Sequence, residues 1–124
     1  IDWLKEQYKQ RSEIHFALDM PKEDLDIKGE YATAVFRITQ EALTNIVRHA
    51  EAKNVEIKVK LINSNILLKV KDDGKGIKTN QLEEAKTFGV FGMKERAAML
   101  GGEMKIISQP NKGTTIDVIL PIKI

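Results

Sequence analysis

The longest regular hydrophobic pattern in the chain runs over Glu30–Ala50. Apolar residues recur there at the three- and four-residue spacing of a helix, at Val35, Ile38, Ala42 and Ile46. Neighbouring apolar residues widen this face. The pattern therefore predicts a long helix that buries one side against another layer of structure.

Elsewhere the apolar positions alternate with polar ones, which is the period of a β-strand with one buried face. Turn residues at Asn63–Asn65 and Pro110–Gly113 separate two pairs of these segments, so each pair is predicted to form a hairpin. The predicted strands are Glu13–Leu18, Val55–Lys60, Ile66–Val70, Met104–Ile107 and Thr114–Leu120.

Three shorter segments have helical patterns. Met93–Leu100 is the clearest, and Gly101-Gly102 is expected to end it. Asn80 and Glu83 have the spacing of a capping pair for a short helix, and Ile1–Arg11 has apolar residues at helical spacing. Hairpins favour antiparallel pairing, and helices segregated from strands favour two layers. We predict an α+β fold: a two-layer α/β sandwich with a mixed, mostly antiparallel sheet covered by about three helices on one face.

Composition narrows the class of protein. The chain has 124 residues, enough for one domain with a substantial core, and no cysteine, which fits a reducing compartment. Twenty basic and eighteen acidic residues give a net charge of +2, without the clustered excess typical of nucleic-acid binders. No apolar run is long enough to span a bilayer. We expect a cytoplasmic domain with no nucleic-acid partner.

A polar stripe interrupts the long apolar helix. Glu41, Asn45 and His49 are four residues apart, so on an α-helix each is offset by about 40° from the last. Beside a buried face these groups are partly desolvated and need partners. An Asn oxygen suits Mg²⁺, a Glu can orient an attacking group, and a His can donate to phosphate. A solvated face with contacts such as Arg37 to Glu41 explains the spacing equally well.

Two glycine-containing segments follow. Asp72–Gly76 comes after a predicted strand, and its glycines would let the backbone approach a flat ligand closely. An ordinary Asp-Gly turn has the same composition. Gly89 and Gly92 precede the predicted helix at Met93, where backbone N–H groups and Lys94 could bind phosphate. A flexible helix entry is the alternative. The chain contains neither a P-loop nor a G-x-G-x-x-G motif, so a nucleotide would need a different cradle.

Four segments together resemble one family. Gln40–Ala50 is similar to the N box of the GHKL ATPases, which include sensor histidine kinases, gyrase and Hsp90. Asp72–Gly76 resembles their D-x-G-x-G box, and Phe88–Ala97 their second glycine box, in the form typical of nitrate-sensor and desaturase-sensor kinases. Gly101-Gly102 and Gly113–Thr115 complete the order. The resemblance implies the Bergerat-type version of the predicted sandwich, with ATP and Mg²⁺ as cofactors.

On the phosphate side, the resemblance implies that Asn45 is the Mg²⁺ ligand. Glu41 is the catalytic residue that polarises the attacking group, and His49 faces the phosphates. Gly89 and Gly92 belong to the lid over the triphosphate. This lid is short, because only twelve residues, 77–88, separate the two glycine boxes.

On the adenine side, the resemblance implies that Asp72 binds the exocyclic amino group. Gly74 and Gly76 shape the pocket around the base. Thr114 supports this site through a hydrogen bond or a water, and is a better match to the family's threonine than Thr115.

The resemblance also implies the wider function. The domain would bind ATP-Mg and donate the γ-phosphate to a histidine on a separate dimerisation domain of a two-component kinase. His15 lies in an alternating strand, which favours a packed or edge histidine over a phosphoacceptor. We therefore expect residues 1–12 to be the end of a linker helix from the dimerisation domain, and 13–124 to be the ATP-binding catalytic domain.

The expected partners are the protein's own dimerisation domain and a response regulator, in a homodimeric, membrane-anchored sensor. Two alternatives use the same fold. One is a serine kinase of the anti-sigma type with the same ATP pocket. The other is a degenerate, non-catalytic ATP-binding module, although every motif position is filled.

Overall fold

The computed structural model describes residues 14–19, 29–76 and 89–122, with only the backbone for 49–50. Five strands and three helical segments follow one another along this part of the chain. They are β1 (His15–Asp19), α2 (Glu30–Asn45), the π-helical η1 (Ile46–Ala50), β2 (Asn54–Ile62), β3 (Asn65–Asp72), α5 (Val90–Met99), β4 (Glu103–Gln109) and β5 (Gly113–Pro121).

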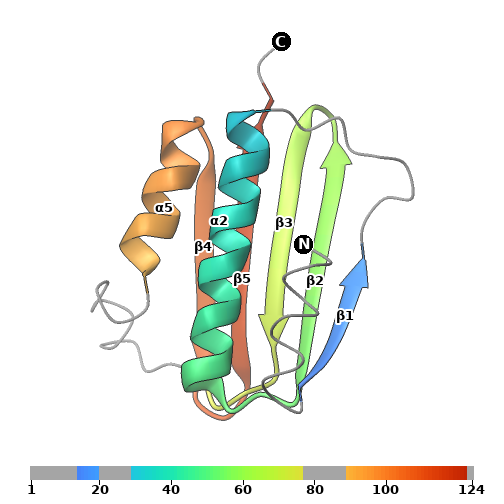
Figure 1. Ribbon diagram of the computed structural model, residues 1–124, viewed down its shortest axis with the longest axis vertical. Coiled ribbons are helices and arrows are strands. Elements are labelled where there is room, and N and C mark those ends of the chain that lie inside the picture. The colour runs from blue at the N-terminus through green and yellow to red at the C-terminus, as the bar shows by residue number, and fades with distance from the viewer. Residues whose placement is uncertain (1–13, 20–28, 77–88, 123–124) are drawn as a thin grey trace.

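The strands form one sheet in the order β1-β2-β3-β5-β4. β1 pairs parallel with β2, and every other neighbouring pair is antiparallel. Parallel pairing needs a crossover between the two strands, and α2 provides it. Figure 1 shows α2 and α5 on the same face of the sheet. The predicted α+β sandwich with a mixed, mostly antiparallel sheet is therefore confirmed. The helices predicted over 1–11 and near 80–85 lie outside the described residues.

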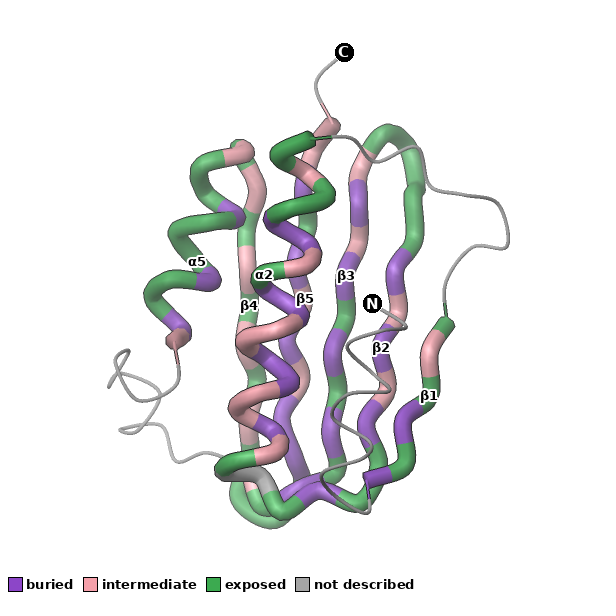
Figure 2. Tube along the Cα trace, viewed as in Figure 1, coloured by how far each residue is buried: buried purple, intermediate pink, exposed green. Residues whose placement is uncertain are grey.

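The core lies between the sheet and α2. Ile38, Ala42 and Leu43 are completely buried on the helix, as the hydrophobic pattern predicted. They pack on the inward positions of the strands, such as Ile57 and Leu68, which are at most 1% exposed. Figure 2 shows this alternation of buried and exposed residues along β2 and β3. None of the helices in the described part of the chain is long and apolar enough to cross a membrane.

The hairpin between β2 and β3 has a two-residue turn. Asn63 and Ser64 both have positive φ, 51° and 63°. This is the requirement of a type I′ turn, whose twist matches that of the flanking strands. The register runs unbroken from this turn to the Val55–Asp72 pair. The hairpin therefore fixes which residues end β3 and which face they occupy.

The two helices differ from their predicted bounds. The long helix is α-helical only to Asn45 and continues as η1, whereas one continuous helix was predicted. α5 begins at Val90, because Gly89 in the left-handed region lets its carbonyl accept from the Met93 N–H (3.1 Å). Gly92 therefore lies inside the helix, and its predicted place before the helix is wrong.

α5 ends as predicted at Gly101-Gly102. The N–H of Gly102 donates to the carbonyl of Ala97 (2.8 Å), and the N–H of Gly101 to that of Ala98 (2.9 Å). These two bonds are those of a Schellman motif, which needs a left-handed residue, and Gly101 has a φ of 74°. The motif turns the chain directly into β4.

Candidate functional site

Asp72 is the last residue of β3 and faces the helix layer. The alternation of the strand puts it on the same face as Leu68 and Val70, and it is only 4% exposed. Its Oδ1 accepts from the N–H of Gly74 (2.8 Å). Burial raises the pKa of the Asp72 carboxyl, while backbone N–H groups of Gly74 and Thr114 oppose that rise. A buried carboxylate held in this way is a fixed acceptor for a ligand donor.

Thr114 lies beside Asp72 in the neighbouring strand. The two residues are register partners between β3 and β5, and Thr114 is 7% exposed. The Thr114 hydroxyl lies 2.8 Å from the hydroxyl of Ser108. Because side chains alternate along β5, Thr115 lies on the opposite face of the sheet from Asp72. The geometry thus favours Thr114 over Thr115 as the polar neighbour of Asp72, as the resemblance implied.

Two glycines hold the Asp72–Gly76 loop against the turn between β4 and β5. Gly113 has a φ of 92°, and a Cβ there would collide with the carbonyl oxygen of Asp72. Gly76 has a φ of 75°, and its Cβ would collide with the carbonyl oxygen of Gln109. A side chain at either position would push the loop away, so the close approach requires glycine.

Asp73 has a different role from that of its neighbour. Its Oδ1 accepts from the backbone N–H groups of Lys53 (2.9 Å) and Asn54 (2.8 Å), and its Oδ2 from the Asn54 side chain (2.8 Å). The Asn54 side-chain bond is the main reason that the pKa of Asp73 lies below its ordinary value. Asp73 therefore ties the loop to the start of β2. This role of Asp73 was not predicted from the sequence, although strand alternation does place the two aspartates on opposite faces of the sheet.

The predicted polar stripe begins in the C-terminal half of α2 and continues into η1. Figure 1 shows the C-terminal end of α2 at the same end of the domain as the end of β3, where Asp72 is the last residue. Glu41 and Asn45 are both half-buried beside the apolar face, so their expected partial desolvation is confirmed. His49 lies in η1, where a turn holds more residues than in an α-helix. The predicted 40° offset therefore applies from Glu41 to Asn45 but not onward to His49, whose side chain is not among those described.

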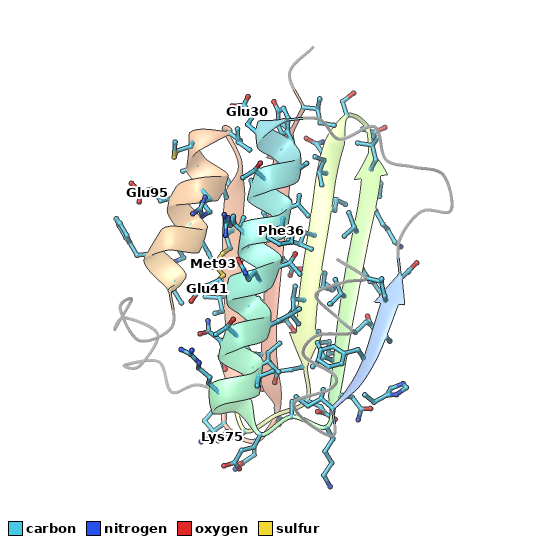
Figure 3. The ribbon with its side chains drawn as sticks, viewed as in Figure 1. Glu30, Phe36, Glu41, Lys75, Met93 and Glu95 are labelled. Atoms are coloured by element: carbon cyan, nitrogen blue, oxygen red, sulfur yellow. The ribbon has the colours of Figure 1, made fainter. Side chains whose placement is uncertain are left out.

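A cleft of about 250 Å³ lies between α2 and α5. Figure 3 shows Glu41 and Met93 in the space between the two helices. A Cβ at Gly89 would collide with the Glu41 carboxylate, so the second glycine segment packs directly on the stripe. The cleft is lined from α2 by Arg37, Gln40 and Glu41, and from the α5 side by Gly89, Gly92, Met93 and Arg96.

Arg37 does not pair with Glu41 in the described part of the chain. Its guanidinium donates to the side-chain oxygen of Gln40 (3.2 Å) and lies 5.8 Å from the centre of the Phe36 ring. The i,i+4 contact that offered a purely structural explanation of the stripe is therefore not formed. Arg37 and Arg96 were given no functional role from the sequence. The four-residue spacing between Arg37 and Glu41 could have placed Arg37 beside the stripe. Nothing in the sequence placed Arg96 there before the bounds of α5 were known.

The donor set limits how a metal could be held. Among the described residues, no group of three or more His, Cys, Asp or Glu side chains could hold a metal ion. Mg²⁺ does not need such a cage, because it keeps several waters and takes other ligands from phosphates. Asn45 and Glu41 supply hard oxygen donors one helical turn apart. The site thus fits Mg²⁺ delivered with a nucleotide.

Comparison with known proteins decides the family. Residues 30–124 match the family described as "Histidine kinase-, DNA gyrase B-, and HSP90-like ATPase". The chain belongs to this ATPase family. The family resemblance drawn from the four motifs is therefore confirmed, and an ATPase domain implies ATP as the ligand.

Relatives of this ATPase domain are histidine kinases. It is 35% identical to the signal transduction histidine-protein kinase/phosphatase DegS of Bacillus subtilis (strain 168), over 98% of this chain and 32% of that protein. It is 39% identical to the sensor histidine kinase LiaS of the same organism, over 96% of this chain and 32% of that protein. The chain thus spans about a third of the length of these relatives.

Solved structures agree on the fold. The blue-light activated histidine kinase EL346 of Erythrobacter litoralis superposes with a TM-score of 0.82 at 19% identity, over 98% of this chain and 40% of that one. At this identity the likeness concerns the fold of the ATPase domain. The roles of the individual site residues stay predictions.

Proposed function

We propose that the chain binds ATP-Mg and donates the γ-phosphate to a histidine on a dimerisation domain outside these residues, within a two-component kinase. Family membership and the histidine-kinase relatives support this proposal. The observation that carries it is the pairing of two preformed features. Asp72 and Thr114 are buried side by side at the end of the sheet, and Glu41 lies in a cleft bordered by glycine.

Asp72 would bind the adenine. Its carboxylate accepts a hydrogen bond from the exocyclic amino group, which guanine lacks at that position. Gly74 and Gly76 leave room for the flat base, and the Thr114 hydroxyl supports the same edge directly or through a water. A buried site built to accept a particular N–H group discriminates strongly against ligands without it.

Asn45 would face the phosphates through its side-chain oxygen, with His49 beside it. Mg²⁺ supplies charge neutralisation for the phosphate oxygens when it is bound, and Asn45 would be its protein ligand. Gly89 directly before α5 and Gly92 within its first turn have no side chains. Backbone N–H groups at such a helix start attract anionic oxygens.

Glu41 would act on the nucleophile. A histidine nitrogen attacks the γ-phosphorus, the bond from phosphorus to the β,γ-bridging oxygen breaks, and ADP leaves. The attacking nitrogen is the unprotonated one of the neutral ring, and the proton on the other ring nitrogen is lost as the phosphoryl group is transferred. The Glu41 carboxylate would orient the ring or take that proton. Phosphoryl transfer depends mainly on positioning and charge neutralisation, so a strong base is not required.

Asn45→Ala and Asp72→Ala test this proposal in a titration with ATP and Mg²⁺. We expect Asn45→Ala to lose the Mg²⁺-dependent part of the affinity, and Asp72→Ala to lose selection of ATP over GTP. Lys105→Gln, an exposed position on β4, is the matched control and should bind as the wild type does. Unchanged affinity in both site variants would refute the site assignment.

We further infer that the whole protein is a homodimeric sensor with a cytoplasmic kinase region and a response regulator as its phosphoryl acceptor in signalling. The histidine-kinase names of the relatives support a histidine acceptor over the serine of anti-sigma-type kinases. Acid-labile phosphate on the full-length protein would agree with histidine, whereas acid-stable phosphate on a partner would point to serine.

A further inference from the structure

Two arginines border the Glu41 cleft without neutralising Glu41. Within the described residues, the Arg37 guanidinium interacts only with the neutral Gln40 side chain and the Phe36 ring. Arg96 makes no hydrogen bond or ion pair within the described residues. The cleft thus presents two cationic side chains and one carboxylate toward open space. Guanidinium groups are well matched to carboxylates and phosphates, which they can bind with two parallel hydrogen bonds.

The positions of these groups along α2 separate the nucleotide from the arginines. Asn45 lies one turn beyond Glu41, and Arg37 one turn before it. Eight residues of α-helix place Arg37 about 12 Å from Asn45 along the axis. The phosphates are assigned to Asn45 and to the start of α5 at Gly89. Arg37 lies two turns before Asn45 and Arg96 about two turns after Gly89, so both arginines lie farther along the helices, on the side from which a nucleophile would reach Glu41.

The surface on that side is open for a protein segment. A Cβ built at Gly92 would meet nothing within 4 Å, so the outer side of the first turn of α5 is uncovered at this position in the described structure. Arg96 also borders a second hollow of about 330 Å³, which is lined by Glu30, Thr33, Ala34, Met99 and Leu100. The two hollows therefore adjoin at Arg96 and follow the line between α2 and α5, with both arginines at or near the Glu41 cleft and with apolar side chains and one carboxylate, Glu30, beyond it.

We propose that Arg37 and Arg96 recognise a carboxylate on the segment that carries the phosphoacceptor histidine. This inference rests on the proposed function. The acceptor segment lies along the line between α2 and α5, its histidine reaches Glu41, and an Asp or Glu side chain of the same segment pairs with the two guanidinium groups. Charge complementarity favours this occupant, because two arginines against one glutamate leave the cleft with an excess positive charge.

Arg37 and Arg96 are in this view specificity-determining residues for the acceptor, with no contact to ATP. Their contribution is electrostatic docking, which depends on salt and on the sign of the partner's charge. A purely structural role would show neither dependence.

The test uses the full-length kinase and the variants Arg37→Gln and Arg96→Gln, with Lys105→Gln as the control on another face. Phosphorylation of the acceptor histidine is measured at saturating ATP over a range of NaCl concentrations, and ATP affinity is measured separately. We expect each variant to transfer phosphate about tenfold more slowly at low salt, with a flatter salt dependence. ATP affinity should be unchanged. Arg37→Lys should restore part of the rate.

A charge exchange sharpens the result. Arg37→Glu should slow phosphate transfer further. When this variant is combined with single Asp→Lys or Glu→Lys changes in the acceptor domain, one of those changes should restore the rate of transfer, and its position identifies the carboxylate that Arg37 recognises. If both glutamine variants transfer phosphate as the wild type does, the inference is wrong. If they lose ATP affinity, the arginines belong to the nucleotide site and the inference is also wrong. Failure of the wild type to bind ATP would instead refute the proposed function itself.

Discussion

The strand-end loop, Asp72–Gly76, and the cleft around Glu41 differ in how far their polar groups are already satisfied. In the loop, Asp73 accepts three hydrogen bonds, and Asp72 is held by the N–H of Gly74. In the cleft, within the described residues, Glu41 and Arg96 have no ion pair. The loop is therefore held in place by its own hydrogen bonds before a ligand binds, whereas the cleft has charged side chains that a ligand could pair with.

This difference matches the two tasks that we assign to these regions. Recognition of a base needs an acceptor in a fixed place, and rigidity lowers the cost of binding. Transfer to a protein acceptor needs groups that are satisfied only while the acceptor is present, because interactions confined to the reacting complex favour the reaction. Variants in each region test this difference between the loop and the cleft.

Gly113→Ala should disrupt the loop most strongly. The residue has a φ of 92°, and its new Cβ would collide with the carbonyl oxygen of Asp72. We expect the free energy of unfolding to fall by about 3 kcal/mol, as is typical of enforced backbone strain. Chemical denaturation monitored by circular dichroism measures this change.

Gly92→Ala is the matched control for that variant. It lies within α5, and its Cβ would meet nothing within 4 Å. Replacing glycine by alanine inside a helix should raise the free energy of unfolding by about 0.5–1 kcal/mol. Equal destabilisation by the two variants would contradict the view that Gly113 is required by its surroundings.

Asp72→Asn separates binding from stability. The amide oxygen can still accept from the Gly74 N–H, but the negative charge is lost. ATP affinity should fall about tenfold to a hundredfold, the usual effect of losing a hydrogen bond to a charged group. Calorimetric titration with ATP and GTP measures the loss.

The same variant should be more stable than the wild type at neutral pH. Burial raises the pKa of Asp72 above its ordinary value of 3.8. The free energy of unfolding therefore falls as pH rises from 3.8 through the higher, folded-state pKa, because the carboxyl must then ionise in a buried place. An unfolding midpoint at pH 7 below that of the wild type would contradict this explanation of the shift.

Gly89→Ala should damage the cleft moderately. The residue has a φ of 64°, and its Cβ would displace the Glu41 carboxylate. We expect a loss of about 1–2 kcal/mol in the free energy of unfolding. Histidine phosphorylation should fall more than ATP affinity, because Glu41 is assigned to the nucleophile. A parallel fall in both would mean that the variant acts through the phosphate-binding role of Gly89 and not through Glu41.

Asp73→Asn should have the smallest effect. The pKa of Asp73 is lowered from 3.8, chiefly by the Asn54 side chain, so its contribution to stability is present above pH 3.8 and is lost as pH falls through the lower, folded-state pKa. Asp73 is exposed, so the loss at neutral pH should stay below about 1 kcal/mol. Unfolding curves between pH 2 and pH 7 should lose part of their acid-side slope.

Much of the fold could be predicted because burial imposes short periods on the sequence. Val35, Ile38 and Ala42 predicted the buried face of α2, and alternation predicted the inward residues of β2 and β3. The Gly101-Gly102 pair correctly predicted the end of α5, because the chain needs a left-handed residue there. The stripe of Glu41 and Asn45 was also predicted, together with its partial burial.

Other features depend on contacts between distant segments and could not be read locally. The collision of a Cβ at Gly113 with Asp72 exists only because β5 pairs with β3. The bonds from Lys53 and Asn54 to Asp73 likewise need the loop to return to the start of β2. No glycine or proline lies in η1, so the change from α-helix to π-helix after Asn45 could not be predicted from the sequence. Arg96 joins the cleft only through the packing of α5 on α2.

The two-residue turn at Asn63 and Ser64 offers a place to attach a reporter. β2 and β3 are antiparallel, so this turn and Asp72 lie at opposite ends of the same eight-residue strand. The separation is roughly 24 Å. A longer loop carrying a fluorophore or an epitope there would cost little closure entropy. Such a labelled chain would report nucleotide and acceptor binding by anisotropy, with the label on neither surface.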